Sequence, residues 1–141
     1  MVTFMNKIEG LLSKLSGWVL LLARVSVGIV FCNSGWYKFN HLEQTIGFFS
    51  SLGIPQAQLQ VPFVAGVEFL GGLALIIGFR ARLVTLPLIG VMSVAVLTAK
   101  LKEVTGVASF VGLEEFNFAL ILALIATNGP GYFAVSRRKR S

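Results

Sequence analysis

Several ionisable side chains lie inside strongly apolar stretches of this chain. Glu68 is near the start of the run VEFLGGLALIIGFRAR at residues 67–82, and Arg24 interrupts the apolar run at residues 17–39. A charged side chain at the centre of a membrane span costs about 2.5–3.5 kcal/mol, so each of these groups needs a partner or water. A carboxylate and a guanidinium held in this setting could bind the polar end of a lipid-soluble ligand or pass protons.

We predict that these side chains face the interior of a helix bundle and form one polar network. With about 1.5 Å of rise per residue, Arg24 lies roughly 10 Å in from one membrane face and Glu68 roughly 10 Å in from the other. An extended arginine could mostly close the remaining difference in depth, so Glu68 is expected to pair with Arg24. The candidate ligand-binding or network residues are Arg24, Lys38, Glu68, Glu114 or Glu115, Asn117 and Asn128, with Lys38 closing the network at the outer end, and no catalytic residue is assigned.

A purely structural interpretation of these groups stays open. Arg24 could extend to the cytoplasmic headgroups and Lys38 to the outer headgroups, with their apolar stems along the helix. Glu68 is too short for this and must be neutral, paired or in contact with water. A Glu68–Arg24 pair that only stabilises the fold is therefore the alternative to a functional site.

The composition indicates a single membrane domain covering residues 1–141. Hydrophobic residues make up 55% of the chain and charged residues only 13%, which is too apolar for an ordinary soluble domain. The net charge of +6 does not indicate nucleic-acid binding, because the basic residues lie at the ends of apolar runs. The single cysteine, Cys32, and the single histidine, His41, exclude a Cys-x-x-Cys dithiol relay, a bis-histidine haem and an ordinary zinc site, so no metal site and no intrinsic cofactor are expected.

The apolar runs predict an all-α fold, an integral membrane four-helix bundle with a short interfacial helix between spans one and two. Roughly 20 residues cross the hydrocarbon layer. A short amphipathic segment at residues 1–15 is expected on the membrane surface, Pro62 is expected to start the second span, and Pro87 to kink the third or shift its start. The expected spans are residues 17–39, 62–79, 83–99 and 114–133, with a loop at residues 100–113 and a basic cytoplasmic tail at residues 134–141.

The basic residues predict the orientation of these spans. Eight lysines and arginines lie in the N-terminal segment, the turn at residues 80–82 and the tail, against three in the other two loops. Cytoplasmic loops of membrane proteins carry the excess of lysine and arginine. Both termini and the short turn are therefore expected in the cytoplasm.

The spacing of several residues resembles the DoxX family of small four-span bacterial membrane proteins. The matching pieces are Arg24-x3-Gly28-x2-Phe31-x3-Gly35-x2-Lys38, Gly53-Ile54-Pro55, Glu68-x2-Gly71-Gly72-x5-Gly78-x-Arg80-x-Arg82 and Gly129-Pro130-Gly131. The chain departs from the family late in the third span, where many members carry a histidine and this chain has Thr98, Ala99 and Lys100. It departs again after Gly131, where an acidic residue is common and this chain has Ser136 and Arg137.

The resemblance implies a location in the bacterial inner membrane and a link to redox chemistry. Some relatives are tied to quinone-linked oxidoreductases, including a thiosulfate:quinone oxidoreductase subunit. We therefore expect a redox-associated subunit that binds a quinone or another lipid-soluble ligand in the bundle. Because the chain has no self-contained catalytic or metal site, any electrons would have to come from a soluble or membrane oxidoreductase partner.

Two other functions fit the same sequence. The first is a non-catalytic scaffold that anchors or assembles a soluble oxidoreductase. The second is a small proton-coupled transporter, as a homo-oligomer, with Glu68 as its proton site. The transporter is the weaker of the two, because the chain shows no inverted repeat and no paired broken helices.

Overall fold

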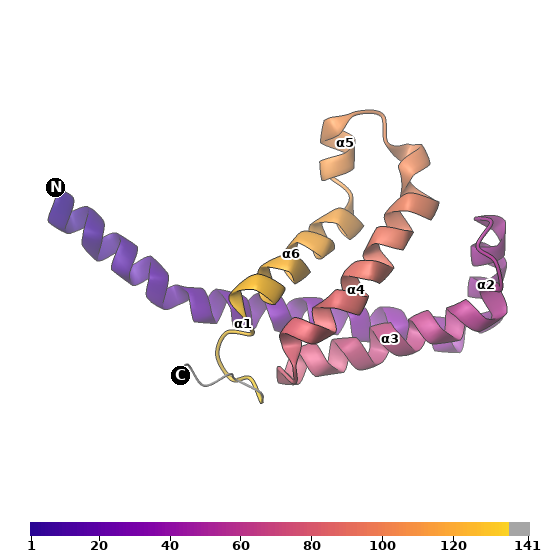
Figure 1. Ribbon diagram of the computed structural model, residues 1–141, viewed down its shortest axis with the longest axis horizontal. Coiled ribbons are helices and arrows are strands. Elements are labelled where there is room, and N and C mark those ends of the chain that lie inside the picture. Colours follow the sequence, from indigo (N-terminus) through magenta and orange to yellow (C-terminus); the bar gives the residue numbers. More distant parts are fainter. Residues whose placement is uncertain (136–141) are drawn as a thin grey trace.

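The computed structural model describes residues 1–135, and the elements in this part of the chain are helices (Figure 1). Ser136 and Arg137, where the chain departs from the family, lie outside the described residues, as does most of the predicted basic tail. The α-helices are α1 (Val2–Asn40), α2 (Leu42–Ser51), α3 (Ala57–Ile77), α4 (Ala81–Ala95), α5 (Val107–Val111) and α6 (Glu114–Asn128), and α4 continues through a π-helical turn (Val96–Lys100) and a 3-10 turn (Leu101–Glu103).

The predicted helical membrane protein is confirmed. Three helical segments are long and apolar enough to cross a bilayer: Val2–Asn40, Ala57–Ile77 and Ala81–Glu103. The expected fourth span, residues 114–133, is shorter than predicted, because α6 ends at Asn128 and has 15 residues. Its length of about 22 Å falls short of the roughly 30 Å of hydrocarbon, so a fourth crossing stays a prediction. Gly129 ends the helix with a φ of 97°, and Pro130 follows it.

The amphipathic segment expected at residues 1–15 is not a separate element. Residues 2–40 form one uninterrupted helix of 39 residues, α1. The hydroxyls of Ser13 and Ser16 bond the backbone carbonyls of Gly10 and Ser13, three residues earlier, so neither serine caps a new helix. Figure 1 shows the first third of α1 leading away from the other helices.

Other helix boundaries also differ from the prediction. The helix α3 begins at Ala57, five residues before Pro62, so Pro62 lies inside the helix and has no amide hydrogen to donate to the carbonyl four residues earlier. The helix α4 begins at Ala81, so Pro87 lies inside it. The expected loop at residues 100–113 contains the 3-10 turn and α5. The predicted helix between the first two spans is confirmed as α2.

A very short turn joins α3 to α4, as predicted. Gly78 ends α3 with a φ of 74°, and Arg80 precedes α4 with a φ of 45°. Both residues are in the left-handed region, which glycine adopts without steric cost. The chain therefore reverses within a few residues and brings α4 alongside α3.

The helices pack as two pairs, α1 with α3 and α4 with α6 (Figure 1). Glycines bring the first pair close together: a Cβ on Gly72 would lie 2.6 Å from the carbonyl oxygen of Gly28, and a Cβ on Gly35 would lie 2.6 Å from the carbonyl oxygen of Ala65. Small residues allow such close approach of helix backbones in membranes. The buried core where the two pairs meet consists of Val27, Phe31, Leu75, Ala81, Leu88, Leu122 and Ile125.

Candidate functional site

Lys38, Glu68 and Ser34 form a compact polar cluster between α1 and α3. The ammonium Nζ of Lys38 lies 2.6 Å from Oε2 of Glu68 and donates to Oγ of Ser34 at 2.7 Å. The Ser34 hydroxyl in turn donates to Oε2 of Glu68 at 2.9 Å. The side chain of Glu68 is 3% exposed and that of Lys38 is 18% exposed. This is a nearly buried ion pair in which the carboxylate accepts two hydrogen bonds, the arrangement that such a pair needs in an apolar setting.

Local helix geometry explains this cluster. Ser34 and Lys38 are four residues apart on α1, so their side chains lie on the same face one turn apart. The contact of Gly35 with Ala65 and Phe69 sets the level of α3 at this point, so that Glu68 meets the face that carries Ser34 and Lys38. The cluster therefore lies near the C-terminal end of α1 and at the middle of α3.

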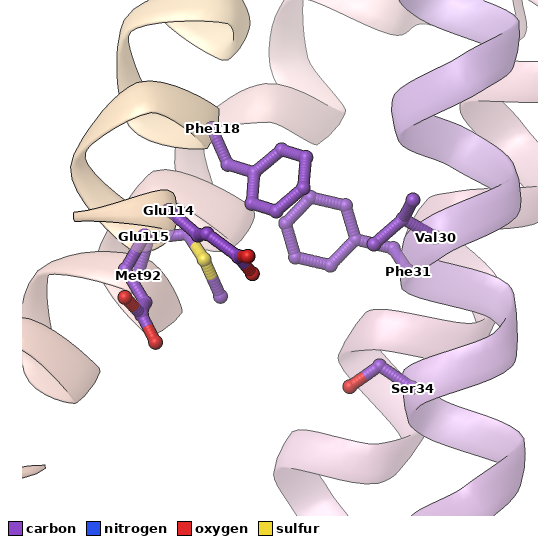
Figure 2. Close-up of a pocket in the computed structure, with 7 residues that line it drawn as sticks. All are labelled: Val30, Phe31, Ser34, Met92, Glu114, Glu115 and Phe118. Carbon is purple, nitrogen blue, oxygen red and sulfur yellow. The ribbon is translucent and has the colours of Figure 1, made fainter. Parts of the chain in front are cut away.

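A small cleft opens beside Ser34, between the two helix pairs. It has a volume of about 120 Å³. Figure 2 shows Ser34 of α1 on one side and Glu114 and Glu115 of α6 on the other, with the rings of Phe31 and Phe118 next to each other. The full lining is Val30, Phe31, Ser34, Met92, Glu114, Glu115 and Phe118. The cleft thus brings the α6 carboxylates to the same open space as the Ser34 hydroxyl.

A larger hollow lies beside Lys38, between the end of α1 and α2. It has a volume of about 320 Å³. Its lining combines aromatic and uncharged polar side chains with one ammonium group: Tyr37, Lys38, Gln44, Thr45, Phe48 and Phe49. The cluster therefore contacts the hollow through Lys38 and the cleft through Ser34.

Arg24 is not the partner of Glu68. Its side chain is fully buried at the other end of the α1–α3 pair, where Nη2 donates to the backbone carbonyls of Tyr132 at 3.3 Å and Phe133 at 3.2 Å. The segment after α6 turns back across α1, where the amide of Tyr132 bonds the carbonyl of Gly17 at 3.2 Å. Arg24 therefore neither reaches the Glu68 carboxylate nor extends to headgroups, and in the described part of the chain it holds this returning segment.

The two predicted asparagines do not join the cluster either. The amide of Asn117 donates to the carbonyls of Val111 and Leu113, and that of Asn128 donates to the carbonyl of Leu124. These bonds are local to each end of α6, and both side chains are exposed. The predicted single network is thus divided: Lys38 and Glu68 form the cluster, Glu114 and Glu115 line the adjoining cleft, and Arg24, Asn117 and Asn128 lie outside it.

Glu115 has a basic neighbour outside the cluster. Nζ of Lys100 lies 4.0 Å from Glu115 and 3.8 Å from Glu103. Lys100 is in the π-helical turn that continues α4, so this weak contact links α4 to the start of α6. Surface pairs at such distances contribute little to stability, about 0–1 kcal/mol.

Ser34 and the α2 side of the hollow were not predicted from the sequence. Ser34 had a usable signal, because it lies four residues before Lys38 and so shares its helix face. The hollow had none, because residues 40–60 were expected only to form a short helix in the membrane interface. The contact of α2 with α1 and α3 is set by the tertiary fold.

Replacing Arg24 with methionine is expected to release residues 129–135 from α1. Hydrogen bonds from a charged group contribute about 1.5–3 kcal/mol, so the released state should become at least about tenfold more populated. Chymotrypsin digestion of the protein in detergent should then cleave faster after Tyr132 or Phe133. Lys102→Met, at an exposed position, is the control, and equal cleavage rates in the two variants would contradict this role of Arg24.

These features define an integral membrane protein built from helices. The chain matches the DoxX family model over residues 19–101, and it belongs to the DoxX family. The resemblance predicted from the glycine and charge motifs is therefore confirmed.

Three curated proteins illustrate the similarity. The chain is 38% identical over 121 residues to "Putative oxidoreductase CatD" of Bacillus subtilis (strain 168), covering 82% of each chain. It is 29% identical over 126 residues to "Inner membrane protein YqjF" of Escherichia coli (strain K12), covering 89% of this chain and 95% of the relative. It is 29% identical over 127 residues to "Inner membrane protein YphA" of the same organism, covering 85% and 89%. No solved structure matches the chain significantly.

Proposed function

We propose that the protein is a membrane subunit of a redox system that binds the head group of a quinone, or of a similar lipid-soluble ligand, in the hollow between α1 and α2. The observation that carries this proposal is the Lys38–Glu68–Ser34 cluster, which reaches the wall of that hollow through Lys38. The relative from Bacillus subtilis whose name refers to an oxidoreductase supports it.

The hollow fits such a ligand better than the cleft does. Small-molecule sites usually measure about 300–1,000 Å³, and they combine apolar walls with a few polar groups. The hollow, at about 320 Å³, reaches this range, whereas the cleft, at about 120 Å³, does not. Tyr37, Phe48 and Phe49 supply aromatic walls, while Gln44 and Thr45 add polar groups.

The residues of the cluster have distinct parts in this proposal. The Lys38 ammonium has three donors, of which the structure uses two, on Glu68 and Ser34, so one can donate to a ligand carbonyl oxygen. Glu68 accepts a hydrogen bond from the Lys38 ammonium and so holds this side chain in place. Ser34 connects Glu68 to the cleft, where Glu114 and Glu115 could take up or release protons. In this proposal, Lys38 therefore binds the ligand, and the α6 carboxylates accept and donate protons.

Electron transfer in this proposal depends on a partner. A bound quinone supplies two-electron, two-proton redox chemistry. One cysteine and one histidine are too few to ligate an iron–sulfur cluster or a bis-histidine haem in this chain. The electrons would therefore come from, or pass to, a soluble or membrane oxidoreductase.

We further infer a location in the bacterial inner membrane with both termini in the cytoplasm. The names of two relatives, which are called inner membrane proteins, support this location. The excess of lysines and arginines near the N-terminus, at residues 80–82 and in the tail supports the orientation. In this orientation the cluster and the hollow lie towards the outer face of the membrane.

Replacing Lys38 with glutamine is expected to weaken quinone binding. The loss of a hydrogen bond from a charged group, about 1.5–3 kcal/mol, should raise the Kd about 10- to 100-fold. The measurement is calorimetric titration of the purified protein in detergent with decylubiquinone, under conditions where circular dichroism shows that the variant is folded.

Lys102→Gln is the matched control, because it removes the same charge from an exposed turn outside the hollow. It should bind the quinone as the unmodified chain does. If the unmodified chain shows no saturable binding, or if Lys38→Gln binds equally well, the quinone proposal fails. Co-purification of a soluble oxidoreductase that is insensitive to changes at Glu68 would then favour the scaffold function.

A further inference from the structure

The N-terminal third of α1 carries an exposed apolar stripe, which consists of Met1, Phe4, Ile8, Leu11 and Leu15. These residues follow one another at alternating steps of three and four. All five are exposed, including Phe4 at 67% and Leu11 at 59%. Alternating steps of three and four give the 3.5-residue period of a coiled-coil seam.

The stripe lies on the side of α1 away from α3. An α-helix turns by about 100° per residue, which places the stripe roughly opposite the face that carries Gly28, Phe31 and Gly35. That face packs against α3, as the contacts of Gly28 and Gly35 show. No helix in the described part of the chain covers the stripe. Near the N-terminus, the side of α1 away from the stripe carries the polar residues Thr3, Asn6, Glu9 and Ser13, together with Gly10.

The length of α1 places the stripe outside the hydrocarbon layer. Its 39 residues span about 58 Å, against roughly 30 Å of hydrocarbon. Because α1 is uninterrupted, its first third continues out of the membrane-spanning part, away from the other helices (Figure 1). A helix that lies on a membrane surface has its axis in the plane of the membrane, which an unbroken continuation of a span does not readily give. Apolar side chains in this position need a cover other than lipid tails.

We propose that the stripe pairs in parallel with the same stripe of a second copy of this chain. Two copies inserted in the same orientation present their α1 helices in parallel. The residues that flank the stripe favour this pairing. Lysines directly precede two stripe residues, with Lys7 before Ile8 and Lys14 before Leu15. Apolar residues directly follow two others, with Met5 after Phe4 and Leu12 after Leu11. In a parallel pair each lysine stem lies against an apolar residue of the second copy, whereas an antiparallel pair would place lysines opposite lysines.

Disulfide cross-linking tests this pairing directly. Cys32 is the only cysteine, so Cys32→Ser provides a background without other thiols. Single cysteines are introduced at stripe positions, as Ile8→Cys, Leu11→Cys and Leu15→Cys. The matched controls are Asn6→Cys and Ser13→Cys on the polar side. Each variant is placed in lipid vesicles at a low protein-to-lipid ratio and oxidised with copper phenanthroline.

The expected result is a cross-linked dimer at the three stripe positions, several-fold more abundant than at the two controls. Equal cross-linking at all five positions, or none at the stripe, would overturn the proposal. A second measurement tests whether the introduced cysteines themselves cause the dimer. In the chain with Leu15→Cys, adding Leu11→Lys should abolish the cross-linked dimer, whereas adding Ser13→Lys should not. Quenching of a fluorophore on Leu11→Cys by brominated lipids, together with absent cross-links, would assign the stripe to the lipid surface and also overturn the pairing.

Discussion

Replacing Lys38 with methionine is expected to lower the free energy of unfolding by about 3–5 kcal/mol, because it leaves the Glu68 carboxylate buried without its cation. Glu68 is only 3% exposed and cannot move to water without moving α3. Its remaining hydrogen bond, from Ser34, does not neutralise the charge. The measurement is equilibrium unfolding in detergent micelles, followed by circular dichroism.

The opposite change, Glu68→Gln, is expected to cost less than Lys38→Met. The Lys38 side chain is 18% exposed and lies near the end of a span, so its ammonium can extend towards water once the carboxylate is gone. The double variant, with Lys38→Met and Glu68→Gln together, should be more stable than Lys38→Met alone, because it removes the stranded charge. Lys102→Met is the control for loss of an exposed lysine. A Lys38→Met variant as stable as this control would show that the pair does not stabilise the fold.

The sequence was sufficient to predict the helical membrane fold. It also showed that the carboxylate of Glu68 lies within an apolar run, which is unusual. The length and apolarity of the runs predicted the membrane helices, since nothing else explains so many uncharged residues. A glutamate cannot reach the headgroups as a lysine can, so Glu68 had to be neutral, paired or in contact with water. In the structure Glu68 is paired, but with Lys38 and not with Arg24 as expected.

The choice of Lys38 over Arg24 depends on the register between α1 and α3. Contact of Gly28 with Gly72 and of Gly35 with Ala65 fixes the antiparallel level of the two helices. At this level Glu68 lies beside residues 34–38 of α1, while Arg24 lies beside Gly78. Depth counted from the membrane faces was too coarse to decide between the two cations, because the tilt and ends of each helix were unknown.

The partners of Arg24 could not be predicted from residue types. They are the backbone carbonyls of Tyr132 and Phe133, and every residue has a carbonyl. Gly129 and Gly131, with φ of 97° and 76°, turn the chain back across α1. The sequence Gly129-Pro130-Gly131 predicts the end of a helix, but the direction of the chain beyond it depends on tertiary packing.

Replacing Gly72 with alanine is expected to destabilise the α1–α3 pair, whereas the same change at Gly66 is not. A Cβ at Gly72 would lie 2.6 Å from both the amide nitrogen of Cys32 and the carbonyl oxygen of Gly28, and these backbone atoms cannot move aside without separating the helices. A Cβ at Gly66, on the same helix, meets no atom within 4 Å. Overpacking costs about 1–3 kcal/mol, while alanine in place of an unhindered helical glycine gains up to about 1 kcal/mol.

The two variants should therefore change stability in opposite directions. Unfolding of both in the same detergent, with the unmodified chain alongside, measures the difference. The contact of Gly72 with α1 also sets the level at which Glu68 meets Lys38. If the protein binds quinone as we propose, Gly72→Ala should therefore also lower the affinity, and Gly66→Ala should leave it unchanged. A Gly72→Ala variant at least as stable as Gly66→Ala would mean that α1 and α3 do not pack at the distance that brings Lys38 and Glu68 together.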